Sequence, residues 1–355
     1  MRLLPASRRV EEARPLRRLS LSAVGVVVAL LLGAALAGLL VGAVGLSPRG
    51  VLAEVADHLP FVSVDSGLGE REAAIVWDLR LPRVVLAALV GATLAAAGAA
   101  YQGVFRNPLA DPYLLGVAAG AGLGATVGIV TVGPAAALVP AAAFAGAVVA
   151  VMLTYALGGI AGGGRAGTTL VLAGVAVAAF FTAVQTFVQQ RHADTVREVY
   201  SWILGRLSTV GWSEVALLAP YAAVSLVVLL LHRRLLDVLA VGEEEAETLG
   251  VSASRVRLLV VAAATLGTAA AVAVSGLIGF VGIVVPHAVR LLVGSSYRVI
   301  VPLSVLGGAA FLVLADLGAR TLAAPAEVPL GVITAFVGAP FFAVVLRSSR
   351  RGWGP

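Results

Sequence analysis

The side chains of this chain that could take part in catalysis are few and lie far apart in the sequence. It contains no cysteine, so it has no disulfide and no thiolate nucleophile or metal ligand. All 25 of its basic residues are arginine, and a chain without lysine cannot contain a Walker A nucleotide-binding loop. The sequence also lacks HExxH and GxSxG motifs. Its four histidines stand in different segments: His58, His192, His232 and His287. This inventory predicts that the chain is not an enzyme and binds no metal or cofactor of its own.

Ionisable residues are also scarce within the apolar segments. Asp316 and Arg320 are separated by four positions, so they can pair on one face of a helix, and Glu327 follows shortly after them. A carrier driven by a proton or sodium gradient normally has ionisable groups near the middle of the membrane. Because no such relay is visible, we expect the energy for transport to come from another chain.

The densest group of charges is an acidic segment at about residues 241–251, between two long apolar runs. Its good helix formers and its final glycine predict a short polar helix with a glycine just after its end. A polar helix held between membrane spans is suited to docking a soluble protein. The residues in question are Gly242, Glu243, Glu244, Glu245, Ala246, Glu247, Thr248, Leu249 and Gly250.

The composition as a whole is that of a membrane protein. Hydrophobic residues make up 60% of the chain and charged residues 12%, and the mean hydropathy is +1.01; a soluble protein carries about 25% charged residues. Because about 20 apolar residues cross the hydrocarbon layer, we predict an all-α polytopic membrane protein with about ten transmembrane helices. The expected spans are 20–46, 82–104, 113–132, 138–158, 168–189, 214–231, 256–275, 277–293, 299–319 and 328–346.

The arginines predict how the chain lies in the membrane. With the N-terminus in the cytoplasm, 17 arginines fall in inside segments and 8 in outside segments, as the positive-inside rule requires. We therefore expect a cytoplasmic tail at 1–19, one transmembrane domain at 20–346 and a second cytoplasmic tail at 347–355. The net charge of +6 is explained by this orientation, so it indicates contact with lipid and not with nucleic acid.

Glycines indicate how two of the helices pack. Gly116, Gly120, Gly124 and Gly128 recur every four residues, a pattern that lets a second helix approach backbone to backbone. We interpret this ridge as structural.

Three groups of residues, in order along nearly the whole chain, together resemble the permease subunits of ATP-binding-cassette (ABC) importers for iron–siderophores, haem and cobalamin, the FecCD-type permeases. The first group is Arg80-Leu81-Pro82-Arg83, followed by residues 101–112, YQGVFRNPLADP. The second is the acidic segment with residues 276–287, GLIGFVGIVVPH. The third runs from Leu314-Ala315-Asp316 through Arg320 to residues 326–332 and 338–340, AEVPLGV and GAP.

This resemblance implies partners and roles for particular residues. It implies a homodimer of ten-span subunits in the inner or plasma membrane of a prokaryote, two ATPase subunits that use ATP-Mg on the cytoplasmic face, and an external substrate-binding protein. It implies that Val241–Val251 couples to the ATPase. It implies a cytoplasmic gate at Asn107, Leu109, Thr168 and Thr169, although Thr168 and Thr169 could equally cap a helix. It implies that Arg80 and Arg320 receive glutamates of the binding protein.

Two questions remain open at the level of sequence. Arg80 and Arg320 could instead extend to lipid headgroups, although we expect Pro82, in the first turn of the second span, to hold Arg80 at the mouth of the helix. The alternative function is a secondary transporter driven by an ion gradient, without an ATPase. The sequence does not select among siderophore, haem and cobalamin.

Overall fold

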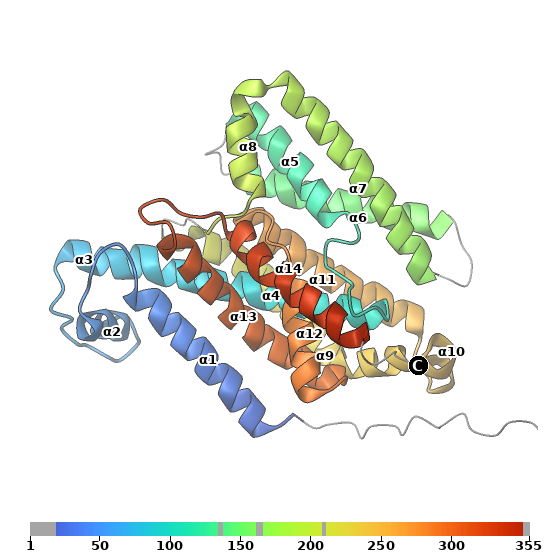
Figure 1. Cartoon of the computed structure of the whole chain (residues 1–355), viewed down its shortest axis with the longest axis horizontal. Helices are drawn as coiled ribbons and strands as arrows, with labels where there is room; N and C mark the ends of the chain where they lie inside the picture. The colour runs from blue at the N-terminus through green and yellow to red at the C-terminus, as the bar shows by residue number, and fades with distance from the viewer. Residues whose placement is uncertain (1–18, 134–137, 161–165, 208–210, 351–355) are drawn as a thin grey trace, which may run out of the picture.

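The computed structural model describes residues 19–133, 138–160, 166–207 and 211–350 (Figure 1). Every regular element in these ranges is helical. A π-helical stretch, Ile75–Arg80, joins α3 to α4, and a 3₁₀ turn, Ala193–Thr195, precedes α8. The α-helices are α1 (Leu21–Leu40), α2 (Pro48–Asp57), α3 (Glu70–Ala74), α4 (Leu81–Val104), α5 (Val117–Val132), α6 (Leu138–Ile160), α7 (Ala166–Arg191), α8 (Val196–Ile203), α9 (Ser213–Val241), α10 (Glu243–Thr248), α11 (Ala253–Ser275), α12 (Val281–Val293), α13 (Tyr297–Thr321) and α14 (Leu330–Arg350).

Ten of these elements correspond to the ten predicted spans. Among the described residues, seven helical segments are long and apolar enough to cross a membrane, and α5, α12 and α14 are shorter apolar helices. The all-α polytopic fold is therefore confirmed.

Several predicted ends are wrong, for identifiable reasons. The second predicted span, 82–104, corresponds to α4, but helix does not start there: it is continuous from Glu70 through the π-helical stretch Ile75–Arg80, which directly precedes α4, to Val104. The sixth span does not end at 231, because α9 continues to Val241 as a polar extension. In the eighth, α12 starts only at Val281, because Gly276 and Phe280 have φ values of +70° that break the helix.

Helix α4 lies at the centre of the bundle, in contact with α9, α11, α12 and α13 (Figure 1). It is buried along most of its length, and small residues bring its backbone against its neighbours. A Cβ atom placed on Gly91 would lie 2.2 Å from the carbonyl oxygen of Gly308 on α13, and one on Gly98 would lie 1.8 Å from that of Gly282 on α12. Only glycine allows these two approaches.

The predicted glycine ridge packs α5 against α6, as expected. A Cβ on Gly120 would lie 2.3 Å from the carbonyl oxygen of Gly146, and one on Gly124 would lie 2.1 Å from that of Ala142. Gly116 is the N-cap of α5, in a left-handed conformation with φ of +83°. The ridge thus has the structural role that its spacing predicts.

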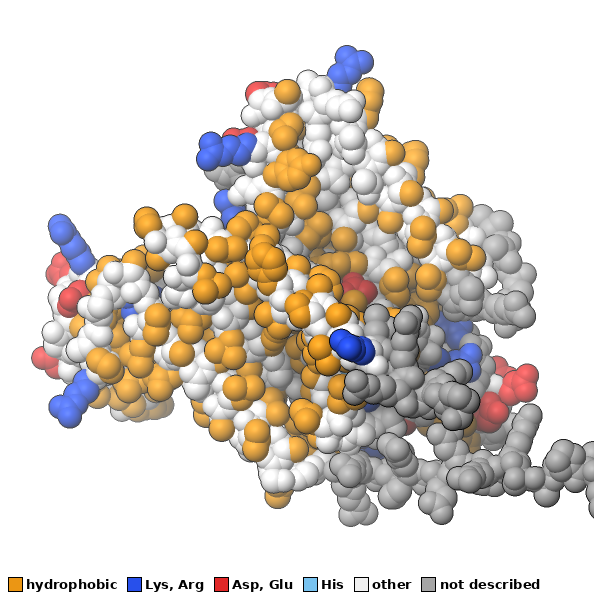
Figure 2. All heavy atoms as spheres, viewed as in Figure 1, with side chains coloured by type: hydrophobic (Ala, Val, Ile, Leu, Met, Phe, Trp, Pro, Cys, Tyr) orange, Lys and Arg blue, Asp and Glu red, His pale blue; other side chains and the backbone are white. Residues whose placement is uncertain are grey.

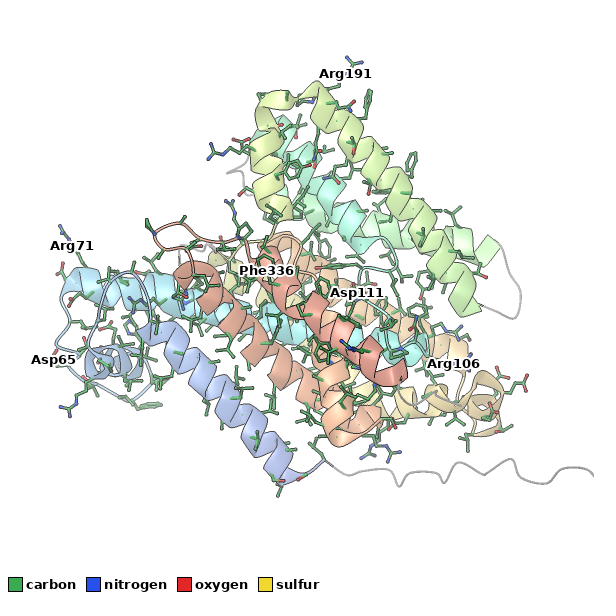
Figure 3. All side chains as sticks on the ribbon, in the orientation of Figure 1. Asp65, Arg71, Arg106, Asp111, Arg191 and Phe336 are labelled. Carbon is green, nitrogen blue, oxygen red and sulfur yellow. The ribbon has the colours of Figure 1, made fainter. Side chains whose placement is uncertain are left out.

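The face of the bundle seen in Figure 2 is largely apolar, and most of its charged groups lie toward its edges. We call the end that carries α2 and α3 the α3 end, and the end that carries α10 the α10 end (Figure 1). Asp65 and Arg71 lie at the α3 end, whereas Arg106 lies toward the α10 end (Figure 3). This separation of charges suits helices that cross a membrane.

Candidate functional site

The acidic segment folds into the short helix α10, whose end is fixed by backbone hydrogen bonds. Gly250 has φ of +76°, its N–H donates to Glu247 O (2.9 Å), and the Val251 N–H donates to Ala246 O (2.9 Å). These two bonds around a left-handed glycine form a Schellman motif. The predicted glycine stop is confirmed.

Helix α10 is anchored by one side and exposes its carboxylates on the other. Ala246 is fully buried in the hydrophobic core, and Gly242 at the N-cap is buried as well. Glu244, Glu245 and Glu247 are exposed, and Leu249 is 68% exposed beside them. Acidic side chains accordingly gather at the α10 end in Figure 2; the side chain of Glu243 is outside the described part of the structure. The surface that results is acidic, with an apolar residue at its edge.

The first pair of predicted gate residues lies in the loop that follows α4, which we call the gate loop (residues 105–116). Arg106 adopts a positive φ of +50°, which turns the chain sharply away from the helix. The Asn107 side-chain Oδ1 then accepts the Leu109 N–H (2.9 Å) in an Asx turn. Leu109 itself is 49% exposed. Asn107 therefore shapes the loop, and Leu109 is presented by it.

The second pair of predicted gate residues lies at the start of α7. Thr169 is half-buried there, and the side chain of Thr168 falls outside the described residues.

The gate loop is held at its far end by side chains that the sequence analysis did not single out. The Tyr113 hydroxyl donates to Ile278 O (3.0 Å) and accepts the Ile278 N–H (3.2 Å). Asp111 Oδ1 accepts the Tyr113 N–H (2.7 Å), and burial raises the pKa of Asp111 to about 6. The loop is thus joined to the non-helical stretch before α12.

Arg80 is not at the mouth of a helix, contrary to expectation. It is only 5% exposed, and its guanidinium donates to the carbonyl oxygens of Leu39 (2.8 Å) and Leu40 (3.1 Å) and to that of Val44. The cause is the continuous helix from Glu70, which carries Arg80 inward against the end of α1. A cation at this position satisfies carbonyls that the end of α1 leaves free and matches the negative end of its dipole.

Arg320 contacts the same end of α1. It stands in the last turn of α13 and donates to Gly38 O (2.6 Å), and its Nε lies 3.4 Å from Asp316. The predicted pairing of Asp316 with Arg320 is confirmed, but it is the weaker of two contacts. The structure therefore brings the two predicted docking arginines together around the end of α1.

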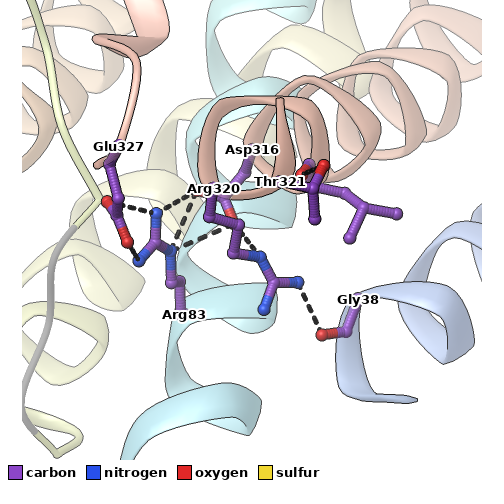
Figure 4. A network of polar contacts seen from close by, with 7 residues as sticks. Gly38, Arg83, Asp316, Arg320, Thr321 and Glu327 are labelled. Atoms are coloured by element: carbon purple, nitrogen blue, oxygen red, sulfur yellow. Dashed lines mark hydrogen bonds and ion pairs between the residues drawn. The ribbon is translucent and has the colours of Figure 1, made fainter. Parts of the chain in front are cut away.

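The stronger partner of Asp316 is Arg83, a residue that sequence reasoning passed over. Its Nε lies 2.9 and 3.1 Å from the two Asp316 oxygens, and its two terminal nitrogens donate to Glu327 at 2.8 and 3.0 Å (Figure 4). Asp316 is 2% exposed, whereas the Glu327 side chain is 47% exposed. These hydrogen bonds lower the pKa of Glu327, which lies in the loop outside the spans.

A polar cavity of about 210 Å³ adjoins this ion cluster at the α3 end. Arg83, Arg206, Asp316 and Glu327 line it, together with the loop residues Val328 and Pro329. The second arginine of the Arg-Leu-Pro-Arg group was the available signal for this cluster, because charged side chains within membrane spans almost always face the bundle interior and pair there.

Comparison with known proteins finds the same group of proteins that the sequence motifs resemble. The profile of the FecCD transport family matches residues 28–348. The chain is 46% identical over 281 residues to the cobalamin import system permease protein BtuC of Halobacterium salinarum, covering 79% of this chain and 75% of that protein. It is 40% identical to the iron(3+)-hydroxamate import system permease protein FhuB of Bacillus subtilis (78% and 72% covered) and 40% identical to the hemin transport system permease protein HmuU of Yersinia pestis (75% and 81% covered).

A solved structure has the same fold. An inward-facing conformation of a metal-chelate-type ABC transporter superposes with a TM-score of 0.80 at 28% sequence identity, covering 92% of this chain and 99% of that chain. The correspondence therefore extends through the whole helical bundle.

Proposed function

This chain belongs to the FecCD transport family, the permeases of ABC importers for iron chelates, haem or cobalamin, and we propose that it forms the membrane pathway through which one such cargo enters the cytoplasm. As a permease subunit it is not catalytic. We propose that a separate ATPase hydrolyses ATP-Mg on the cytoplasmic face and that an external binding protein delivers the cargo.

The observation that carries this proposal is the exposed acidic helix α10. Its carboxylates are exposed at the α10 end, where acidic side chains gather in Figure 2, and Ala246 fixes it to the core. A helix with one buried and one exposed side can transmit a push from a soluble partner to the membrane helices. We infer that Gly242–Gly250 contacts the ATPase and that the α10 end faces the cytoplasm, with both termini on that side.

The remaining assignments complete the proposed importer. Two copies of the chain would form the pathway at their interface. Asn107 and Leu109, with Thr168 and Thr169, would close it at the cytoplasmic side. Relatives of comparable identity are named for cobalamin, iron-hydroxamate and hemin, so sequence identity does not select the cargo.

Uptake into proteoliposomes tests the proposal. The chain is reconstituted with its ATPase and binding protein, and labelled cyanocobalamin, ferrichrome and haemin are supplied in parallel. We expect uptake of one of them that requires ATP and is blocked by vanadate. Replacing Glu243–Glu247 by a Gly/Ser linker should leave the permease inserted but abolish uptake and weaken ATPase binding. Uptake driven by an ion gradient, or normal uptake by the linker variant, would contradict the proposal.

We also propose that the external binding protein docks at Arg80 and Arg320. Both guanidinium groups are engaged with the end of α1, so docking would require them to exchange backbone carbonyls for carboxylates. Arg80 is only 5% exposed and the Arg320 side chain 10%, so a glutamate at either position would also face the α1 carbonyls unpaired, and the double variant Arg80→Glu with Arg320→Glu is compared with both single variants. The test is binding-protein affinity in nanodiscs; unchanged affinity in a folded double variant would end the docking assignment.

A further inference from the structure

A polar cluster at the α10 end, with Gln102 and Tyr297 buried at its centre, connects four helices. The Arg290 guanidinium on α12 donates to the Gln102 side-chain oxygen on α4 (3.0 Å) and to the Tyr297 hydroxyl on α13 (3.1 Å). Its central carbon lies 5.4 Å from the centre of the Tyr297 ring. Gln102 also donates to Gly282 O (3.3 Å) at the start of α12. One arginine thus joins the end of α4 to the start of α13.

The cluster is linked to the acidic helix through Asp237 on α9. The Asp237 carboxylate accepts the Tyr297 N–H (2.5 Å) and the Ser296 hydroxyl (2.9 Å), so it caps the start of α13 from a neighbouring helix. Helix α9 passes from Asp237 to Val241 and then, through Gly242, directly into α10. Movement of α10 must therefore act on the helix that holds this cap.

The same cluster is linked to the gate loop on its other side. The backbone carbonyl of Gln102 accepts the Asn107 N–H (3.2 Å). Gly103, the next residue of α4, lies directly on Tyr297: a Cβ at this position would be 3.2 Å from the ring. The start of the gate loop therefore rests on a side chain that α13 and Arg290 hold in place.

Stability alone does not explain these polar groups. Gln102 is fully buried and Tyr297 is 4% exposed, and burying polar groups costs free energy that hydrogen bonds only partly return. Apolar side chains of similar volume often stabilise a protein as well or better. Directional polar contacts, in contrast, can exchange partners between two discrete arrangements.

We propose that Gln102, Asp237, Arg290, Ser296 and Tyr297 form a relay that transmits movement of α10 to the gate loop. The relay rests on the proposed function, because it requires an ATPase that moves α10. Its members are positioning residues, because each acts by holding the next element.

The absence of cysteine makes the relay directly testable. Thr248→Cys on α10 and Arg106→Cys in the gate loop, both at exposed positions, are introduced separately as reporters. The permease is reconstituted with its ATPase in nanodiscs, where both faces are open, and labelled with a charged maleimide under ADP and under ATP with vanadate. In the otherwise unchanged protein we expect the labelling rate to differ between the two nucleotide states at both reporters.

Two relay variants and one matched control are compared. Tyr297→Phe and Gln102→Leu each remove one relay contact. Tyr101→Phe removes an equally buried tyrosine hydroxyl on α4, one that bonds Thr265 (3.0 Å) outside the relay. We expect the relay variants to keep the nucleotide response at position 248 and lose it at position 106, while the control keeps both. Size-exclusion profiles and thermal midpoints establish that each variant is folded.

The outcomes separate the relay from the proposed function. A full response at position 106 in both relay variants would overturn the relay alone. Loss of the response at both reporters, or an equal loss in Tyr101→Phe, would also overturn it, because the effect would then be general destabilisation. No nucleotide response at position 248 in the unchanged protein would overturn the proposed function and the relay with it.

Discussion

Arg83→Met tests the ion cluster at the α3 end. The substitution leaves the Asp316 carboxylate 2% exposed and without the contacts at 2.9 and 3.1 Å that hold it. Removing one partner of a buried ion pair costs about 3–5 kcal/mol. Because Arg320 remains 3.4 Å from Asp316, we expect the lower end of this range, about 3 kcal/mol.

Two further variants make the expectation specific to the buried pair. Glu327→Gln removes the other partner of Arg83, whose side chain is 47% exposed, and should cost only about 0–1 kcal/mol. The double variant Arg83→Met with Asp316→Leu removes both charges of this pair and should recover part of the loss, since well-packed apolar groups can replace a buried pair, while Arg320 loses its own contact with Asp316.

These expectations are tested by measuring the free energy of unfolding of each variant by denaturant titration in mixed micelles. Arg83→Met should be less stable than both Glu327→Gln and the double variant. If Arg83→Met lowers the free energy of unfolding by no more than Glu327→Gln does, the Arg83–Asp316 pair contributes only as much as an exposed ion pair. If the double variant is no more stable than Arg83→Met alone, the loss comes from packing of the arginine stem and the electrostatic reasoning is refuted.

Three further predictions address packing, titration and topology. Gly98→Val should prevent folding into the native bundle, because a Cβ would lie 1.8 Å from a carbonyl oxygen of α12, whereas Gly25→Val, with nothing within 4 Å, should be tolerated; detergent size-exclusion profiles compare the two. Burial raises the pKa of Asp111 from its ordinary 3.8 to about 6, so stability should fall as pH rises between these two values, and Asp111→Asn should remove that fall in a pH series of thermal midpoints. Cysteines at Asp65 and Arg106 should react with an impermeant reagent from opposite sides of the membrane; reaction of both from one side would contradict the topology.

The sequence predicts well the features that depend on neighbours along the chain. The ten predicted apolar runs correspond, among the described residues, to seven segments long enough to cross a membrane and three shorter apolar helices, and glycines every four residues give the contact of α5 with α6. The glycine after the acidic helix ends it as expected, because the left-handed φ at Gly250 is a local preference. These signals lie within one or two helical turns, where spacing alone determines which side chains meet.

Features that depend on tertiary contacts were not predictable in this way. Arg83 and Asp316 are 233 positions apart, so nothing in the local pattern favours this pair over the i, i+4 pair with Arg320. Arg80 has the local environment of a helix start, yet a continuous helix buries it against α1. The cap that Asp237 places on α13 likewise joins residues 60 positions apart.

Helix α4 connects the two polar clusters, which determines how they can influence each other. Arg83 lies in its first turn and Gln102 in its last, at opposite ends of the bundle. Between them, Gly91 and Gly98 bring its backbone directly against α13 and α12, and close-packed backbones of this kind have little room to bend. We infer that α4 moves as a rigid body together with the segments it touches, so a change at either end reaches the other as a displacement and not as a local distortion. The two polar clusters lie at the two ends of α4. Their contacts can exchange partners there, and so accommodate a displacement of the helix.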